Sequence, residues 1–290
     1  MFLGHRSDVA PNFKKPMPQY NNKKVLFNDN GQFSILNNIC PHQGSLIISS
    51  MKESMSCQYH GWSWDNNGHP ANSGNTVVCN SSRLSKKEAF ETNSLIFSEK
   101  IDLSSVNHVD LSFMKLVEER TDLVESNYRN IIDVFLDVDH IPVVHPEVYT
   151  QVGVADQSEV EWAYYDWGNI QFVKKNGPLT KEYKDTLLGI DEEKLAAFWV
   201  TLYPYVTIDW QPGYLTVMSC VPDGENRTKA VIHQYRDTRY SDENWRINKN
   251  IWETAWMQDK HQAEVIVARS QSEQNLEEAK LHFRNWEENK

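Results

Sequence analysis

The stretch "CPHQGSLIISSMKESMSCQYHGW" (residues 40–62) contains two short motifs, each with one cysteine and one histidine. Its pattern is C-x-H-x14-C-x2-H, with Cys40 and His42 in the first motif and Cys57 and His60 in the second. Thiolate and imidazole are protein ligands of both zinc and iron. The four residues together predict a metal centre.

The spacing bears on two kinds of centre. A structural zinc site takes all four side chains as one tetrahedral set, whereas a Rieske [2Fe–2S] cluster binds two thiolates on one iron and two imidazoles on the other. Zinc fingers follow a cysteine pair with a histidine pair, but here each motif supplies one of each. Pro41, Gly44 and Gly61 allow tight loops that bring backbone N–H groups near bridging sulfides.

This stretch resembles the Rieske family residue by residue. The resemblance implies four cluster ligands: Cys40, His42, Cys57 and His60.

Short β-prone runs lie on both sides of the motifs. "KVLFND" and "GQFSILNN" are separated by an Asn/Gly turn, and "GWSWDNNGHPAN" repeats that arrangement. "NSLIFSEK", near residue 95, is another short strand, while residues 1–22 show no sustained period and are expected to form an irregular arm. We therefore expect residues 1–105 to form a small antiparallel-β Rieske domain with an N-terminal arm.

A second set of metal-ligating residues occurs in "DVFLDVDHIPVVHPE" (residues 133–147). Its apolar residues recur mostly at helical spacing and predict a helix that ends near Pro142. His140 and His145, at and beyond that helix end, can present two imidazoles to one metal. Two histidines and one carboxylate, with open coordination positions, are typical of non-haem Fe(II) oxygenases.

The segment resembles the mononuclear-iron motif of Rieske non-haem iron oxygenase α subunits. That family carries an acidic residue three positions before the first histidine, which Asp137 matches. The resemblance implies a homotrimer in which this carboxylate bridges His60 of one subunit to His140 of the next. "NYR" (residues 127–129) resembles the family's Asn-Trp-Lys, whereas Val134 departs from its usual asparagine.

The family's third iron ligand is a carboxylate of the C-terminal helix. "AWMQDKHQAEVIVARSQ" matches this context with Asp259 as the ligand, and Glu253 and Glu264 are the alternatives. Residues 242–290 lack Gly and Pro and predict a long amphipathic helix.

Antiparallel strands are predicted within residues 160–175, 196–222 and 227–239. With the resemblance, these elements imply an α+β chain. Residues 106–290 are then expected to form a START-like (helix-grip) catalytic domain of antiparallel sheet with helices.

The resemblance implies the terminal component of a ring-hydroxylating or demethylating oxygenase with a Rieske cluster and a mononuclear Fe(II). Such an enzyme uses O2 and electrons from NAD(P)H to oxidise a small organic substrate. No G-x-G-x-x-G follows a strand here, so the reductase or ferredoxin is expected to be a separate protein that docks near His42 and His60.

The substrate is less well defined by the sequence. Aromatic walls suit either a flat aromatic substrate or a quaternary ammonium held by cation–π contacts. The candidate wall residues, several of which are expected in the core, are Trp162, Trp167, Trp199, Trp210 and Tyr214.

Two other functions stay open at this point. One is a Rieske electron carrier or hydrophobic-ligand-binding protein without a working second iron, and the other is a zinc-stapled structural protein. The net charge of −11 argues against a nucleic-acid partner. The lack of a long apolar run or a secretory start predicts a soluble, cytoplasmic protein without a membrane partner. Cys79 and Cys220 are expected to be free or buried thiols.

Overall fold

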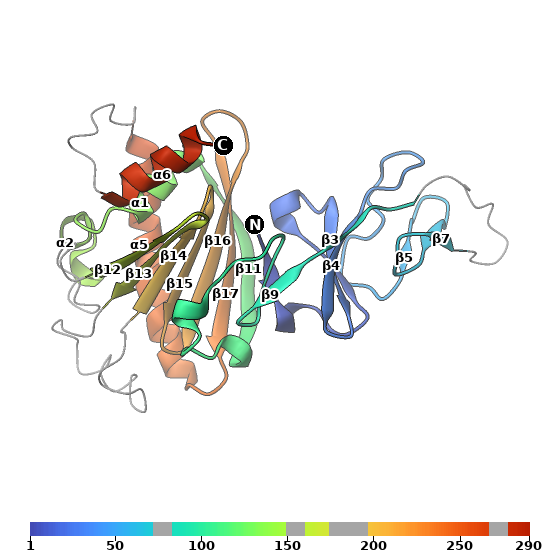
Figure 1. Ribbon diagram of the computed structural model, residues 1–290, viewed down its shortest axis with the longest axis horizontal. Coiled ribbons are helices and arrows are strands. Elements are labelled where there is room, and N and C mark those ends of the chain that lie inside the picture. The colour runs from blue at the N-terminus through green and yellow to red at the C-terminus, as the bar shows by residue number, and fades with distance from the viewer. Residues whose placement is uncertain (72–82, 149–159, 174–196, 267–277) are drawn as a thin grey trace. The chain divides into compact units, whose positions relative to one another are not determined.

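Residues 1–71, 83–148, 160–173, 197–266 and 278–290 are described in the computed structural model. The chain divides into two compact units, Met1–Ser112 and Phe113–Lys290 (Figure 1). The division falls a little beyond residue 105, where the sequence places the boundary. Antiparallel sheets form the first unit, and a sheet with helices forms the second, so the predicted α+β class is confirmed.

The first unit contains three small antiparallel sheets, with strand orders β1-β10-β9, β2-β3-β4-β8 and β5-β6-β7. The strands are β1 (Phe2–His5), β2 (Lys14–Pro16), β3 (Lys24–Asp29), β4 (Gln32–Asn37), β5 (Met55–Ser56), β6 (Ser63–Trp64), β7 (Pro70–Ala71), β8 (Lys86–Glu88), β9 (Phe90–Thr92) and β10 (Leu95–Phe97). Short 3₁₀ helices span Arg6–Asp8, Pro18–Tyr20, Ser104–Val106 and, at the division between the units, Leu111–Phe113.

The strands predicted between residues 24 and 97 are confirmed, but the expectation of an irregular N-terminal arm is wrong. β1 pairs with β10, and the Phe2 ring contacts the Phe97 ring edge-on at 6.0 Å. Lys14 of β2 is buried and donates to Asn66 Oδ1 at 2.6 Å. Strands of three or four residues are too short to show a period in the sequence.

The second unit is one antiparallel sheet of seven strands, in the order β11-β17-β16-β15-β14-β13-β12. The strands are β11 (Met114–Val124), β12 (Val160–Tyr165), β13 (Gly168–Val173), β14 (Ala197–Leu202), β15 (Val206–Gln211), β16 (Tyr214–Pro222) and β17 (Thr228–Asp237). The helices are α1 (Tyr128–Phe135), α2 (Ile141–Val144), α5 (Asp242–Val265) and α6 (Glu278–Glu288).

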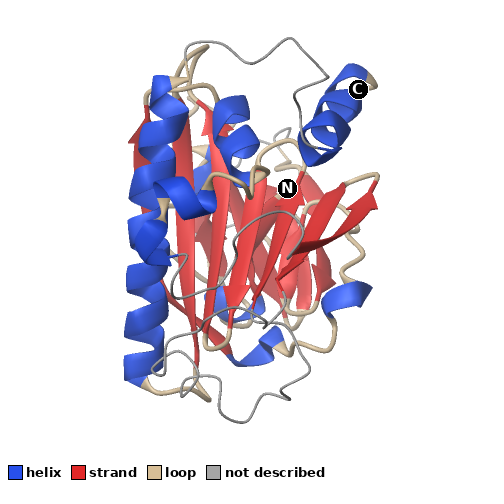
Figure 2. Ribbon diagram, turned by 90° about the vertical axis from the view of Figure 1, so that its left-hand side faces the viewer, coloured by secondary structure: helices blue, strands red, loops and turns tan. Residues whose placement is uncertain are grey.

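Helices α1 and α5 pack on each other and on this sheet, and Figure 2 shows the long helix beside the strands. Their shared core includes Ile132, Trp252 and Trp256 with residues of the central strands. All the strands predicted beyond residue 160 are confirmed in the described ranges. Among those ranges no helix is long and apolar enough to cross a membrane. Cys220 is a buried free thiol, as expected, and Cys79 lies outside the described residues.

Two helix predictions are wrong in their limits. α1 ends at Phe135, and Pro142 instead lies in the first turn of α2. Backbone N–H groups in the first turn have no partner within the helix, so the N–H that proline lacks costs no helical hydrogen bond there. The C-terminal helix stops at Val265, and Ile266 is extended with φ −71° and ψ 106°. Consecutive β-branched residues from Val265 onward disfavour a continued helix.

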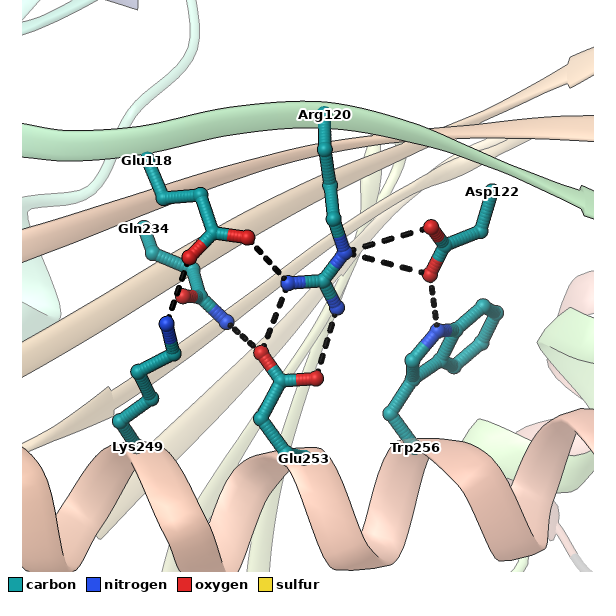
Figure 3. A network of polar contacts seen from close by, with 7 residues as sticks. All are labelled: Glu118, Arg120, Asp122, Gln234, Lys249, Glu253 and Trp256. Carbon is teal, nitrogen blue, oxygen red and sulfur yellow. Dashed lines mark hydrogen bonds and ion pairs between the residues drawn. The ribbon is translucent and has the colours of Figure 1, made fainter.

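Strand β11, which the sequence analysis did not predict, is joined to α5 by a partly buried network of charges (Figure 3). Arg120 donates to both carboxylate oxygens of Glu253, at 2.7 and 2.8 Å. Arg120 also donates to Glu118 at 2.8 Å and to Asp122 at 3.2 Å, so three carboxylates surround one guanidinium.

Neighbouring side chains complete the network. Lys249 of α5 donates to Glu118 at 2.5 Å, and the Trp256 indole N–H donates to Asp122 at 2.8 Å. The Gln234 amide donates to Glu253 at 2.7 Å. Because charges from β11 and α5 alternate along the contact, the network sets the position of the helix along the sheet.

Replacing Arg120 with alanine tests this anchoring. Arg120→Ala leaves three clustered carboxylates without their shared partner. Removal of one member of a fully buried set costs about 3–5 kcal/mol, and we expect about half of that for this partly buried network. The melting temperature should then fall by at least about 3 °C in thermal unfolding. Arg246→Ala is the control, because Arg246 and Glu243 form an exposed pair on the same helix, and it should leave the melting temperature nearly unchanged. Equal shifts in the two variants would contradict the anchoring role.

Candidate metal centres and pocket

The two Cys/His motifs form loops with matching backbone hydrogen bonds. Gly44 N–H donates to the Cys40 carbonyl at 2.9 Å, and Gly61 N–H donates to the Cys57 carbonyl at 2.8 Å. Both glycines are in the left-handed region, with φ of +75° and +73°. Residues with a side chain rarely adopt this conformation, so glycine at these positions permits the tight turn of each loop.

The loops separate their thiols from their imidazoles. Cys40 and Cys57 are buried, each 3% exposed, whereas His42 and His60 are exposed. The two imidazoles point their Nδ1 atoms at each other, 3.1 Å apart. A buried sulfur pair and a converging imidazole pair match the divided ligand set of a Rieske cluster.

Polar groups around Cys57 favour its thiolate. Burial opposes ionisation, but the Ser45 hydroxyl, 3.4 Å from Sγ, and backbone N–H groups of Tyr59 and His60 lower the pKa of Cys57 below its usual value. The thiolate is the form that binds metals.

A second group of donors converges in the other unit. His140 Nε2 and His145 Nε2 are 3.1 Å apart, and they lie 3.1 Å and 2.6 Å from Asp259 Oδ1. At metal–ligand distances of about 2.1 Å, ligands at right angles are about 3 Å apart. The three side chains could therefore hold one metal ion.

Among the residues that the structure describes, His140, His145 and Asp259 form a group that could hold a metal ion. Their donor atoms all lie within 4.8 Å of one another.

Local structure explains how these donors meet. His140 and His145 flank the single turn of α2 as its N-cap and C-cap, and Asp259 lies on α5. The neighbouring Gln258 accepts from His145 Nδ1 at 2.7 Å, which leaves Nε2 as the free donor atom. The sequence analysis missed Gln258, although its place beside Asp259 in the quoted segment was a usable signal.

Asp137 lies behind His140, as the sequence predicts. Its Oδ1 accepts from the His140 backbone N–H at 3.2 Å and is 3.8 Å from the ring Nδ1, an ion-pair distance. Its Oδ2 accepts from Lys280 of α6 at 2.8 Å. No sequence pattern pointed to Lys280, which is far along the chain from Asp137.

The charges of the group are mutually stabilising. Burial would lower the pKa of His140, but the Asp137 and Asp259 carboxylates raise it to about 9. Burial likewise opposes ionisation of Asp259, yet the two imidazoles hold its pKa below the usual value.

The alternative acids of α5 point elsewhere. Glu253 binds Arg120 in the network described above. Glu264 accepts from the backbone N–H of Glu125 at 3.1 Å and lies 3.9 Å from Lys260. Asp259 is thus the predicted acid that reaches both histidines.

A pocket of about 640 Å³, mouth included, opens beside His140, His145 and Asp259. Its other walls are Phe135, Asp137, Val138, Ile141, Val148, Trp199, Asp209, Gln211, Ile251, Trp252 and Ala255. Of the five aromatic candidates from the sequence, Trp199 is a wall residue. Trp210 and Tyr214 are buried, while Phe135 and Trp252 are wall residues that the sequence analysis missed.

The pocket contains a carboxylate that is not accounted for by the metal group. Asp209 and Gln211 alternate on β15, and the register places Trp199 opposite Asp209. Asp209 Oδ1 and Gln211 Oε1 are buried without a hydrogen-bond partner in the described structure. Burial raises the pKa of Asp209 to about 7, and the Gln211 amide and Trp199 indole oppose that rise in part.

Comparison with protein families identifies both units. Residues 1–83 match the family model "Rieske [2Fe-2S] domain", and residues 102–269 match "Ring hydroxylating alpha subunit (catalytic domain)".

Individual relatives are distant. The chain is 23% identical to putrescine 2-hydroxylase of Ralstonia nicotianae (strain ATCC BAA-1114 / GMI1000), over 73% of this chain and 62% of the relative. It is 22% identical to chloroplastic choline monooxygenase of Beta vulgaris, over 76% of this chain and 53% of the relative. The chain therefore spans between about half and two thirds of the length of these relatives.

The fold is also similar to solved structures. The quaternary ammonium Rieske monooxygenase CntA in complex with L-carnitine matches with a TM-score of 0.69 and 14% identity, over 99% of this chain and 86% of that chain.

The raised pKa of Asp209 predicts a pH-dependent stability. The folded protein keeps this proton to about pH 7, whereas the unfolded chain releases it near its ordinary pKa of 3.8. Stability is therefore lost as the pH rises between these values, and it stays lower above pH 7. Asp209→Asn removes the titrating group and with it this loss of stability. The difference in melting temperature, variant minus parent, should therefore be at least about 3 °C larger at pH 8 than at pH 5, measured in amine-free buffer.

The control is Asp242→Asn, because Asp242 is 85% exposed at the start of α5. Its difference from the parent should not change over this pH range. If the melting-temperature difference between Asp209→Asn and the parent is also constant over this pH range, burial does not raise the pKa of the Asp209 carboxyl.

Proposed function

Because the chain belongs to the ring-hydroxylating α-subunit family and also carries a Rieske domain, we propose that it is the terminal oxygenase of a Rieske non-haem iron system. The observation that carries this proposal is the convergence of His140, His145 and Asp259 at the wall of a pocket. Two histidines and one carboxylate are the ligand set of non-haem Fe(II) oxygenases. In this proposal the three side chains hold the mononuclear iron.

The cluster ligands in this proposal are Cys40, His42, Cys57 and His60. When bound, the cluster carries single electrons, and the mononuclear iron offers open positions for dioxygen. His42 and His60 are exposed, together with the neighbouring loop residues. A separate ferredoxin or NAD(P)H-dependent reductase would dock there.

Asp137 is a positioning residue in this proposal. It already contacts the backbone and the ring side of His140, and a carboxylate in that place fixes the tautomer and orientation of a ligating imidazole. In a homotrimer it would also accept from the partner subunit's His60 and so couple the two centres. Lys280 holds the second oxygen of Asp137 and keeps the carboxylate charged.

The substrate proposal is a small nitrogen compound. The relatives named above are a putrescine hydroxylase and a choline monooxygenase, and the solved structure was determined with L-carnitine. A carboxylate in the pocket of this chain suits such compounds better than an aromatic hydrocarbon. In a monooxygenation, one oxygen atom of O2 enters a C–H bond and the other leaves as water, with two electrons from the reductase and two protons.

The second candidate is an electron carrier or ligand-binding protein without a working second iron. It predicts that the anaerobically purified protein holds the cluster alone, even after incubation with Fe(II). The donor geometry at His140, His145 and Asp259 favours the oxygenase.

Metal analysis tests the oxygenase proposal directly. We expect about three irons and two inorganic sulfides per chain, with a Rieske-type electron paramagnetic resonance signal after dithionite. Asp259→Ala should reduce the iron to about two and leave the sulfide unchanged. Glu264→Ala, on the same helix, should keep all the iron. Two irons in the parent protein after Fe(II) incubation would exclude a working mononuclear site.

Asp137→Asn tests the coupling role. The amide has the size of the carboxylate but cannot accept from two imidazoles with the same strength. We expect both metal centres to be retained, while electron transfer from the reduced cluster in a single turnover slows by at least about 100-fold, or ~2.7 kcal/mol in barrier. Full iron content with an unchanged transfer rate would remove Asp137 from the pathway.

A further inference from the structure

We propose that Asp209 and Gln211 form the part of the pocket that selects the substrate, and that they bind the ammonium group of a small protonated amine against the Trp199 indole. This inference rests on the proposed function, because it assigns a substrate class to the same pocket.

The first support is the charge of the pocket. Three carboxylates line it, and two of them have partners: Asp259 meets the two histidines and Asp137 meets Lys280. No lysine or arginine is among the described wall residues. Asp209 is therefore the wall carboxyl without a cationic side chain beside it, and a cation in the cavity would be its complementary partner.

The second support is unused hydrogen-bonding capacity. Asp209 Oδ1 and Gln211 Oε1 are buried acceptors without partners, and they lie on one side of β15 at alternate positions. A buried acceptor without a protein partner favours a ligand that donates to it, so a ligand that donates to both atoms suits this site. An ammonium group with N–H bonds can do this, whereas a quaternary ammonium has no N–H to donate.

The third support is the aromatic neighbour. Trp199 is the cross-strand partner of Asp209 and also lines the pocket, with Trp252 of α5 in the same lining. An indole face attracts a cation, and the attraction grows when water is excluded. Carboxylate, amide and indole together favour a cation over a neutral compound of the same shape.

Calorimetric binding to the iron-loaded protein under anaerobic conditions at pH 8 tests the proposal. The probes are 1,3-diaminopropane, 1,4-diaminobutane and n-butylamine, each compared with the alcohol of the same chain length. At least one amine should bind about 10-fold or more tightly than its alcohol. Asp209→Asn should weaken the binding of that amine by about 10-fold or more, because the amide removes the charge that pairs with the ammonium group.

The controls separate the charge at Asp209 from other effects. Asp242→Asn removes an exposed charge of the same unit and should bind the amine as the parent does. Asp209→Glu keeps the charge and should bind it more tightly than Asp209→Asn does. Tetramethylammonium, a cation without N–H bonds, should bind more weakly than the best amine.

Three results would overturn the proposal: amines that bind no better than their alcohols, Asp209→Asn binding with parental affinity, or tetramethylammonium binding as tightly as the amines. The measurement needs no turnover, so its failure is distinguishable from failure of the oxygenase proposal. If the protein holds three irons but does not bind amines, this inference alone is wrong. If it binds amines through Asp209 but does not hold the third iron, the oxygenase proposal alone is wrong.

Discussion

The bidentate pair of Arg120 and Glu253 sets where α5 lies on its sheet, and the second metal centre depends on that position. Asp259 is less than two helical turns beyond Glu253, whereas its two histidine neighbours belong to a separate segment. A shift of α5 by one residue would rotate Asp259 by about 100° away from them. Apolar packing of Trp252 and Trp256 holds the helix down but is less specific in register than paired charges.

Three aspartates of one pocket illustrate how surroundings assign roles to the same side chain. Asp259 is kept ionised by two imidazoles, and Asp137 by Lys280 and His140. No lysine or arginine is among the described residues of the pocket wall, and burial raises the pKa of Asp209 to about 7. Their ordinary chemistry is identical, so the difference comes from the partners that the fold brings to each one.

The sequence predicted the features whose determinants are close together along the chain. The loops at Cys40 and Cys57 carry their ligands and their glycines within a few residues, and the histidines of the second group are five apart. Asp259 was found from its context on the helix. β11 was missed because its inward face bears Glu118, Arg120 and Asp122 in place of apolar residues, and these charges are understood only with α5 present.

The same reasoning explains why Asp209 and Lys280 escaped notice. In the sequence each is an ordinary polar residue of a strand or a helix. Its role depends on contacts with residues that are distant along the chain. Pairings of this kind leave no local period or motif.

The single turn of α2 gives a further consequence, for how this chain can change during evolution. His140 and His145 cap its two ends, and Val143 between them is 80% exposed. Many side chains are compatible with such an exposed position. The number of residues between the two histidines is fixed, however, because one insertion would turn His145 by about 100° away from its neighbours. Here natural selection acts on length more than on chemistry, so gaps in this turn should be far rarer than substitutions.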